Sequence, residues 1–235
     1  MRSDSLLVEA ARLMLGTPYV AGTLEGAPEQ LAVALCRSDC ILLVEACAAL
    51  VSTVKGEDCS FEAFVGNLRS MRYRNGVVDG YPSRLHYTSE WALQAGRLGI
   101  LEEVTASLGG IPLKQDFSFM STHPGSYPAL KNDPGAVSAI REAERALARN
   151  TYYYIPKSKL SPLQSRIRHG DILCFTSSTA GLDIAHLGIA VRENGKLKFI
   201  HASSVAGKVV VEPSAPAGYL ASKKGMSGLR VLRMI

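Results

Sequence analysis

The chain has 235 residues, of which 47% are hydrophobic and 20% charged, an ordinary composition for a globular protein with a substantial core. Its formal net charge is +5, but the basic residues are scattered and not interleaved with aromatic residues, which argues against nucleic-acid binding. The five cysteines lack paired spacing and no apolar run is long enough to span a bilayer, so the sequence indicates neither a disulfide framework, nor a zinc ribbon, nor a membrane span.

The first 150 residues carry patterns that are mostly typical of helices. Residues 5–15 have apolar side chains at helical spacing and are followed by Gly16 and Pro18, so we expect an amphipathic helix there. Residues 40–54 are apolar nearly all round, which indicates a buried helix. The other elements predicted in this half are a short helix or turn at 28–36, helices at 60–72, 88–98 and 135–149, and an irregular segment at 104–135.

From Thr151 onward, short alternating or apolar runs predict strands. These runs lie at 152–155, 172–175, 187–191, 197–200, 209–211 and 229–235. Helices followed by an antiparallel sheet predict an α+β fold. Because the chain contains no internal repeat, we expect a single domain over residues 1–235 with helical insertions around 60–150.

Cys40 stands where the buried helix is predicted to begin. Ser38 and Asp39 are both good N-cap residues, so Cys40 falls in the first turn. There the helix dipole favours a thiolate, which is a common way of preparing a nucleophilic cysteine. A lone cysteine is more often a small core residue, so its position alone does not assign a function.

Two histidines flank a predicted hairpin. The dipeptide Asn194-Gly195 is a strong signal for a two-residue turn, and the register that it sets places His186 opposite Ser203. His186 and His201 are then diagonal neighbours on one face, roughly 7–8 Å apart at Cα. One histidine can therefore act as a base while the other fixes its tautomer, as a Cys/His/third-residue site requires.

Several segments resemble NlpC-type cysteine peptidases and amidases, with the reactive residues in the order Cys, His, His. These segments are Gly16-Thr17-Pro18-Tyr19 before Asp39-Cys40, Gly170-Asp171-Ile172-Leu173, and His186-Leu187-Gly188-Ile189 followed by Phe199-Ile200-His201-Ala202-Ser203. Residues 21–25, 81–87, 119–123 and 154–157 resemble one branch, the N-acetylmuramoyl-L-alanine amidase-like proteins. The resemblance implies a papain-like core, in which the helix carrying the cysteine packs on a sheet carrying both histidines.

The same resemblance implies hydrolysis of the amide between N-acetylmuramic acid and L-alanine in peptidoglycan fragments. Cys40 would be the nucleophile, His186 its base and His201 the residue that orients His186. We expect a thiolate–imidazolium pair in which the pKa of Cys40 is lowered. One departure from the family pattern is Cys36, a second thiol close to the nucleophile.

Other residues are candidates for the oxyanion and for substrate. The oxyanion would lie near the first-turn N–H groups beside Asp39, with the Tyr19 hydroxyl as a second donor. A guanidinium suits the carboxylates of a peptide, and a tyrosine ring suits the face of a sugar. The candidates for oxyanion or substrate binding are Tyr19, Asp39, Arg84, His86, Tyr87 and Ser203. We expect no metal and no cofactor.

Three alternatives remain open at this point. The chain could be a γ-D-glutamyl-diamino acid endopeptidase of the same superfamily, or a catalytically silent wall-binding domain. Alternatively, Cys40, His186 and His201 could ligate zinc in a metal-dependent amidase or binding module, although no zinc motif supports this. The expected partners are muropeptides, and the expected location, inferred from that substrate, is the periplasm or cell envelope. The sequence shows no export signal and does not define an oligomeric state.

Overall fold

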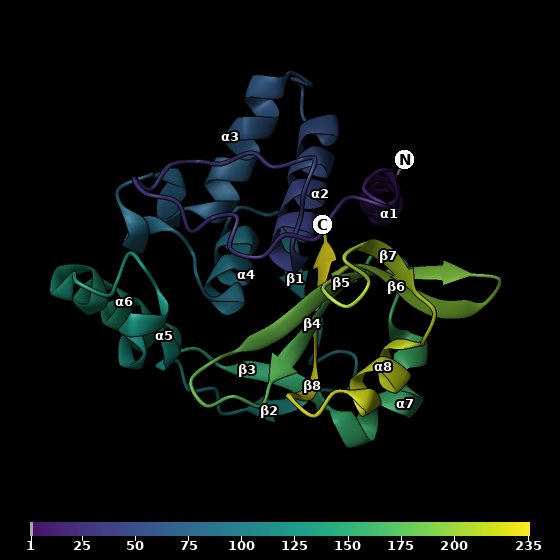
Figure 1. The fold of residues 1–235 in the computed structure, drawn as a ribbon. Coiled ribbons are helices and arrows are strands. Elements are labelled where there is room, and N and C mark those ends of the chain that lie inside the picture. The colour runs from purple at the N-terminus through teal and green to yellow at the C-terminus, as the bar shows by residue number, and fades with distance from the viewer. Residues whose placement is uncertain (1) are drawn as a thin grey trace.

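An antiparallel sheet of eight strands forms the centre of the protein, and the computed structural model describes residues 2–235 (Figure 1). The strand order is β2-β3-β8-β4-β5-β6-β7, and β1 also pairs with β8. The strands are β1 (Leu101–Glu103), β2 (Ile111–Leu113), β3 (Tyr152–Pro156), β4 (Ile172–Ser177), β5 (Ile184–Glu193), β6 (Lys196–Ser203), β7 (Lys208–Glu212) and β8 (Met226–Met234). The long central strands β4, β5, β6 and β8 are the scaffold for the site described below.

Helices cover both faces of this sheet. The helices are α1 (Ser3–Leu13), α2 (Cys40–Lys55), α3 (Phe61–Arg72), α4 (Thr88–Arg97), α5 (Phe119–Thr122), α6 (Pro134–Leu147), α7 (Leu160–Leu163) and α8 (Pro216–Ser222). Helices α1 to α4 lie above the sheet in Figure 1, and α7 and α8 lie below it. Adjacent residues of β5 separate the two cores, since Ile189 packs with the residues of α2 whereas Ala190 packs with Leu220 of α8.

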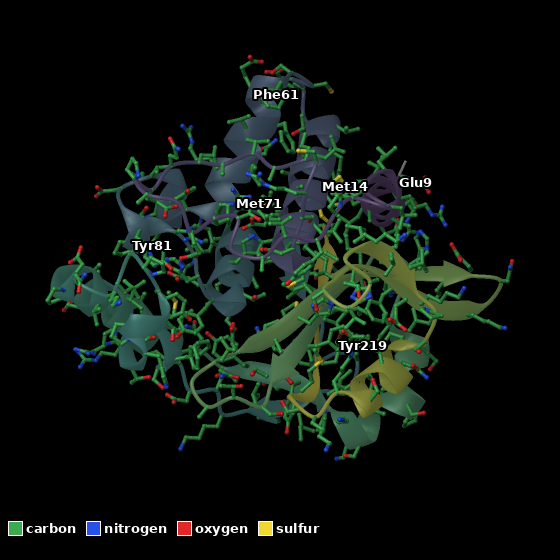
Figure 2. The ribbon with its side chains drawn as sticks, viewed as in Figure 1. Glu9, Met14, Phe61, Met71, Tyr81 and Tyr219 are labelled. Carbon is green, nitrogen blue, oxygen red and sulfur yellow. The ribbon has the colours of Figure 1, made fainter. Side chains whose placement is uncertain are left out.

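Helix α2 is the buried helix of the fold, as expected from its nearly continuous apolar sequence. It contacts α1 and α3 as well as β5 and β6, so hydrophobic side chains on every side of it are buried. The side chain of Met71 from α3 is also fully buried in this layer (Figure 2). In the described part of the chain, no helix has the length and hydrophobicity needed to cross a membrane.

The hairpin of β5 and β6 has the predicted register. Glu193 pairs with Lys196 and Ile189 with Ile200. Both turn residues have positive φ, 50° at Asn194 and 75° at Gly195, as a turn of type I′ requires. The two-residue turn therefore fixes which side chains of the two strands share a face.

The predicted α+β class is confirmed, and the expected helices at 5–15, 40–54, 60–72, 88–98 and 135–149 all form with ends shifted by at most about two residues. The short helix considered for 28–36 does not form. The prediction that residues 104–135 are irregular was wrong in part, because this segment contains β2 and α5. Strand β2 has three residues and exists through its pairing with β3, which local sequence cannot reveal. Helices α7 and α8 were not predicted either, since each is too short for a clear periodic pattern.

Candidate active site

Cys40 is the first residue of α2, and the cap predicted for that helix is present. The Asp39 carboxylate accepts hydrogen bonds from the N–H groups of Ile41, at 3.1 Å, and Leu42, at 2.9 Å. The backbone N–H of Leu187 on β5 acts to lower the pKa of Cys40. The start of the helix therefore lies beside the strand that carries His186. The half-buried thiol therefore lies at the contact between the helical layer and the sheet.

His186 and His201 form a hydrogen-bonded pair, as the predicted hairpin register requires. Nε2 of His186 lies 2.7 Å from Nδ1 of His201, and the two rings are nearly perpendicular at 84°. Gly188 makes room beside them, because a Cβ at that position would come within 3.4 Å of the His201 Cβ and 2.6 Å of the Phe199 ring. The ring of Tyr219 on α8 packs against both histidine rings, with its centroid 6.0 Å from that of His186 and 5.6 Å from that of His201. Since Nε2 of His186 is occupied, Nδ1 is the ring nitrogen left to act as a base.

Two cavities meet at these reactive groups. One has a volume of about 250 Å³ and extends toward α4, and the other has about 720 Å³ and extends toward α8. Cys40, Ala185 and His186 line both cavities, whereas the exposed Cys36 lines neither. Ala185 is exposed and lies in a bulge, since the pairing of β4 with β5 passes from His186 to Ile184. Cys40 and His186 therefore stand where a substrate could extend in two directions.

Burial sets the protonation of the reactive groups. It raises the pKa of Cys40 to about 12, and the negative charge of Asp39 acts in the same direction. It lowers the pKa of His186 to about 3, assisted by His201 and Lys223. Burial thus acts against the charged form of each group, which is opposite to the lowered pKa expected for Cys40 from the helix N-terminus.

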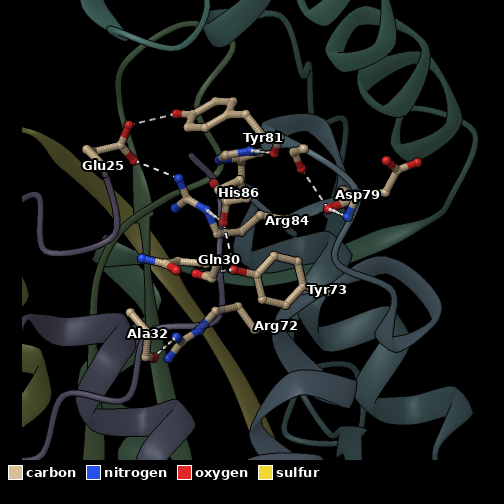
Figure 3. Close-up of polar contacts among 12 residues, drawn as sticks. Glu25, Gln30, Ala32, Arg72, Tyr73, Asp79, Tyr81, Arg84 and His86 are labelled. Atoms are coloured by element: carbon tan, nitrogen blue, oxygen red, sulfur yellow. Dashed lines mark hydrogen bonds and ion pairs between the residues drawn. The ribbon is translucent and has the colours of Figure 1, made fainter. Parts of the chain in front are cut away.

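Arg84 lines the smaller cavity, but its guanidinium is already paired within the protein. It lies 3.0 Å from the Glu25 carboxylate and 3.2 Å from that of Glu29, and it stacks on the Tyr81 ring at 4.8 Å (Figure 3). Arg84 is buried, with a relative exposure of 6%. Its charge is therefore balanced by two carboxylates of the protein.

His86 and Tyr87 also line the smaller cavity, and their polar atoms have protein partners. Nε2 of His86 lies 2.9 Å from the Tyr81 carbonyl oxygen, so it carries the proton and donates it. Burial lowers the pKa of His86 to about 3, which keeps this ring neutral. The Tyr87 hydroxyl donates to Glu144 at 2.7 Å and accepts from the N–H of Met120 at 3.1 Å. These two residues form part of the wall of the smaller cavity.

Tyr19 and Ser203 line the larger cavity. Tyr19 pairs with Ser38 in a short parallel bridge, which holds it beside the start of α2. Burial raises the pKa of Tyr19, so its hydroxyl stays protonated and can donate a hydrogen bond. The Ser203 hydroxyl accepts from the N–H of Ala206 at 3.1 Å. The structure thus brings every predicted site residue except Asp39 into the lining of one or both cavities, and Asp39 caps the helix beneath Cys40.

Among the residues of the cavity walls that were not predicted as site residues are Glu25, Glu212, Tyr219 and Lys223. The last two belong to α8 and its C-cap, an element that the sequence pattern did not predict. Glu212 directly follows the strand predicted at 209–211. A predicted register for the pairing of that strand with β6 would have indicated that Glu212 lies near His201. Among residues 2–235, no group of three or more His, Cys, Asp and Glu side chains is arranged to hold a metal ion.

Known proteins similar to this chain share its fold over nearly the full length. The chain is 38% identical to an N-acetylmuramoyl-L-alanine amidase from Bacteroides uniformis, with 99% of each chain covered and a TM-score of 0.93. It is 41% identical to a Bacteroides fragilis protein provisionally described as a xylanase, with 96% of this chain and 100% of that chain covered and a TM-score of 0.89.

A more distant structure, from Legionella pneumophila, is 23% identical and shares the fold with a TM-score of 0.74, covering 100% of this chain and 90% of that chain. No curated protein matches the chain. The AmiA-like family, described as N-acetylmuramoyl-L-alanine amidase-like, matches residues 9–226, which is most of the sequence. The chain therefore belongs to the AmiA-like family of N-acetylmuramoyl-L-alanine amidase-like proteins.

Proposed function

We propose that this protein is a cysteine-dependent amidase that cleaves the bond between N-acetylmuramic acid and L-alanine in peptidoglycan fragments. Membership of the AmiA-like family and the similarity to the Bacteroides uniformis amidase support the substrate. The observation that carries the mechanism is the placement of Cys40 and of the His186–His201 pair at the junction of two cavities. On this view the chain is one papain-like NlpC-type domain that acts in the periplasm or cell envelope.

The resting protonation suggests how the first step proceeds. Because burial disfavours a charge on either Cys40 or His186 alone, the proton moves from the sulfur to Nδ1 of His186 as the sulfur attacks the lactoyl carbonyl carbon. A thioester forms and the C–N bond breaks, while His186 gives its proton to the departing amine of L-alanine. Water, deprotonated by the same His186, then hydrolyses the thioester and releases the muramic acid carboxylate.

The start of α2 also supplies the oxyanion site in this mechanism. Asp39 already occupies the N–H groups of Ile41 and Leu42, so the Cys40 N–H is the backbone donor that remains in the described first turn. The Tyr19 hydroxyl lines the same cavity as Cys40 and supplies a second donor. Substrate would then lie across the junction, with the sugar acid in one cavity and the stem peptide in the other.

The chemistry at the junction supports amide hydrolysis rather than sugar hydrolysis. Most glycosidases place two carboxyl groups on either side of the bond that they cut. Here the groups that line both cavities are a thiol and an imidazole. Arg84, His86, Tyr87 and Ser203 remain candidates for contacts with substrate, because they line the two cavities.

Mass spectrometry of digested muropeptides tests the proposal. Cleavage of the proposed bond releases a free muramic acid and a peptide that begins with L-alanine. Release of a fragment beginning with the diamino acid would instead identify a γ-D-glutamyl-diamino acid endopeptidase, and intact muropeptides would indicate a binding domain. Activity that survives a chelator but is lost to iodoacetamide would support the thiol over a zinc site.

A further inference from the structure

A third ionisable side chain continues the histidine pair across the sheet. His201 pairs with Val210 and Phe199 pairs with Glu212, so Glu212 on β7 is the diagonal neighbour of His201 on their common face. The same diagonal relation joins His201 to His186 on β5. Three side chains from three adjacent strands therefore form a line, and His186 at its end lines the same two cavities as Cys40.

The Glu212 carboxylate is held in place and faces the outer nitrogen of His201. One of its oxygens, Oε1, accepts a hydrogen bond from the N–H of Ser214 at 3.1 Å. The other, Oε2, lies 3.6 Å from Nε2 of His201. This nitrogen is buried and has no hydrogen-bond partner within residues 2–235, in a residue with a relative exposure of only 2%.

This arrangement decides where the protons sit. A neutral imidazole carries one N–H, and an unprotonated Nε2 on His201 would direct its lone pair at a negative carboxylate. The N–H of His201 therefore favours Nε2, which leaves Nδ1 as an acceptor. His186 must then donate its own N–H through Nε2, because the two nitrogens are 2.7 Å apart. Nδ1 of His186 is left unprotonated, as a base for Cys40 requires.

We propose that Glu212 is a positioning residue that sets the tautomers of both histidines and so keeps Nδ1 of His186 free to take the proton of Cys40. The inference rests on the cysteine mechanism proposed above. Glu212 does not contact the reacting atoms and acts only through His201. The 3.6 Å between Oε2 of Glu212 and Nε2 of His201 is longer than a hydrogen bond, so their contact is electrostatic.

Other charged or titratable groups also face the two histidines. Cys40 of α2 lies at the far end of the line, beside His186. The Tyr219 ring of α8 packs on both histidines, and the Lys223 ammonium lies 4.9 Å from the centre of that ring. Lys223 disfavours a proton on either histidine, whereas Glu212 favours one on His201. Glu212 is thus the charged group that favours the proton of His201 on Nε2, the ring nitrogen that does not contact His186.

Two substitutions of Glu212 separate this role from a purely structural one. In Glu212→Gln, the amide oxygen can keep the Ser214 contact, which turns the NH₂ group toward His201. The NH₂ group would donate to Nε2 of His201, reverse both tautomers and place a proton on Nδ1 of His186. We expect kcat to fall on the order of 10²- to 10⁴-fold with KM nearly unchanged, since trapping the wrong tautomer behind a catalytic histidine has this kind of effect. Glu212→Ala loses the Ser214 contact but donates nothing, so it should be less impaired than Glu212→Gln.

The matched control is Glu193→Gln, because Glu193 is a carboxylate of β5 that contacts Arg12 and Lys198 at the surface and lines neither cavity. Its kcat should equal that of the unmodified protein. If Glu212 only supports the turn at Ser214, Glu212→Gln will be fully active and Glu212→Ala impaired. That order of activities would overturn the proposal.

Nitrogen-15 NMR of the histidine rings gives a readout that does not depend on turnover. In the unmodified protein we expect the proton on Nε2 of both His186 and His201, and in Glu212→Gln on Nδ1 of both. Unchanged tautomers in Glu212→Gln would refute the role of Glu212 even if the protein is an active amidase. Tautomers that change as expected in a protein that cleaves no muropeptide would support the role of Glu212 and reject the proposed function instead.

Discussion

Two clusters of ionisable side chains line the smaller cavity and its junction with the larger one, and they are stabilised in opposite ways. In the arginine cluster, Arg84 faces Glu25 and Glu29, and Arg72 faces Glu45, so each charge is balanced by a countercharge. In the proposed catalytic cluster, burial disfavours the charged forms of Cys40 and His186. The first arrangement fixes the shape of a wall, because breaking a pair would leave a buried charge. The second can move a proton, because neither partner is committed to an ionised state.

The largest expected effect comes from removing the thiol. Cys40→Ala should reduce the rate of muropeptide cleavage roughly a million-fold, because a nucleophile acts together with its base as a unit. The melting temperature should change little, since the thiol carries no charge that the fold must balance. Cys36→Ala is the control, and it should retain full activity because Cys36 is exposed and lines neither cavity. Cleavage of muropeptides by the Cys40→Ala variant would disprove the proposed mechanism.

Breaking a pair in the arginine cluster should affect the fold rather than the chemistry. Nε of Arg72 lies 2.8 Å from Oε2 of Glu45, and the two side chains are 2% and 3% exposed. Arg72→Met leaves Glu45 without its partner, so we expect the free energy of unfolding to fall by about 3–5 kcal/mol, measured by urea denaturation.

The double variant Arg72→Met with Glu45→Met provides the control for this pair. It removes both charges together, so much of the lost stability should return. If the double variant is as unstable as the single one, the loss comes from packing and the comparison between the two clusters fails.

The reactivity of Cys40 toward iodoacetamide tests whether the catalytic cluster is neutral at rest. Burial raises the pKa of this thiol to about 12, so the thiolate fraction should grow about ten-fold for each pH unit up to that value. We therefore expect the alkylation rate of the substrate-free protein to rise steadily from pH 7 to pH 10. A constant, high rate below pH 7 would show that a thiolate–imidazolium pair already exists.

The last prediction concerns the stability of the fold in acid. The pKa of His86 is lowered to about 3, so below its ordinary value of 6.5 the unfolded chain takes up a proton that the folded protein does not. The contribution of His86 to the free energy of unfolding is complete above pH 6.5. It is lost as the pH falls toward 3, by about 1.4 kcal/mol per pH unit. Urea denaturation at several pH values measures the slope, and His86→Phe should make it shallower. An unchanged slope would mean that His86 is not held neutral by the fold.

The sequence predicted those parts of the site that depend on local structure. The first turn of a capped helix defines Cys40, and a two-residue turn defines the partnership of His186 and His201. The cavity walls depend on contacts between distant segments. Glu25 comes from a loop far from Arg84 in the chain, and no local pattern could show that it neutralises that guanidinium. The pKa of Cys40 is raised rather than lowered for a related reason. Burial is the main cause, and it depends on how α2 packs against β5.

The bulge at Ala185 has a consequence for the range of substrates. Its side chain is a single methyl group, and it lies beside Cys40 and His186 where the two cavities join. A larger side chain at this position would reduce the space beside Cys40 and His186 while leaving both groups in place. On the proposed mechanism, the room for substrate and the transfer of the proton therefore depend on different residues.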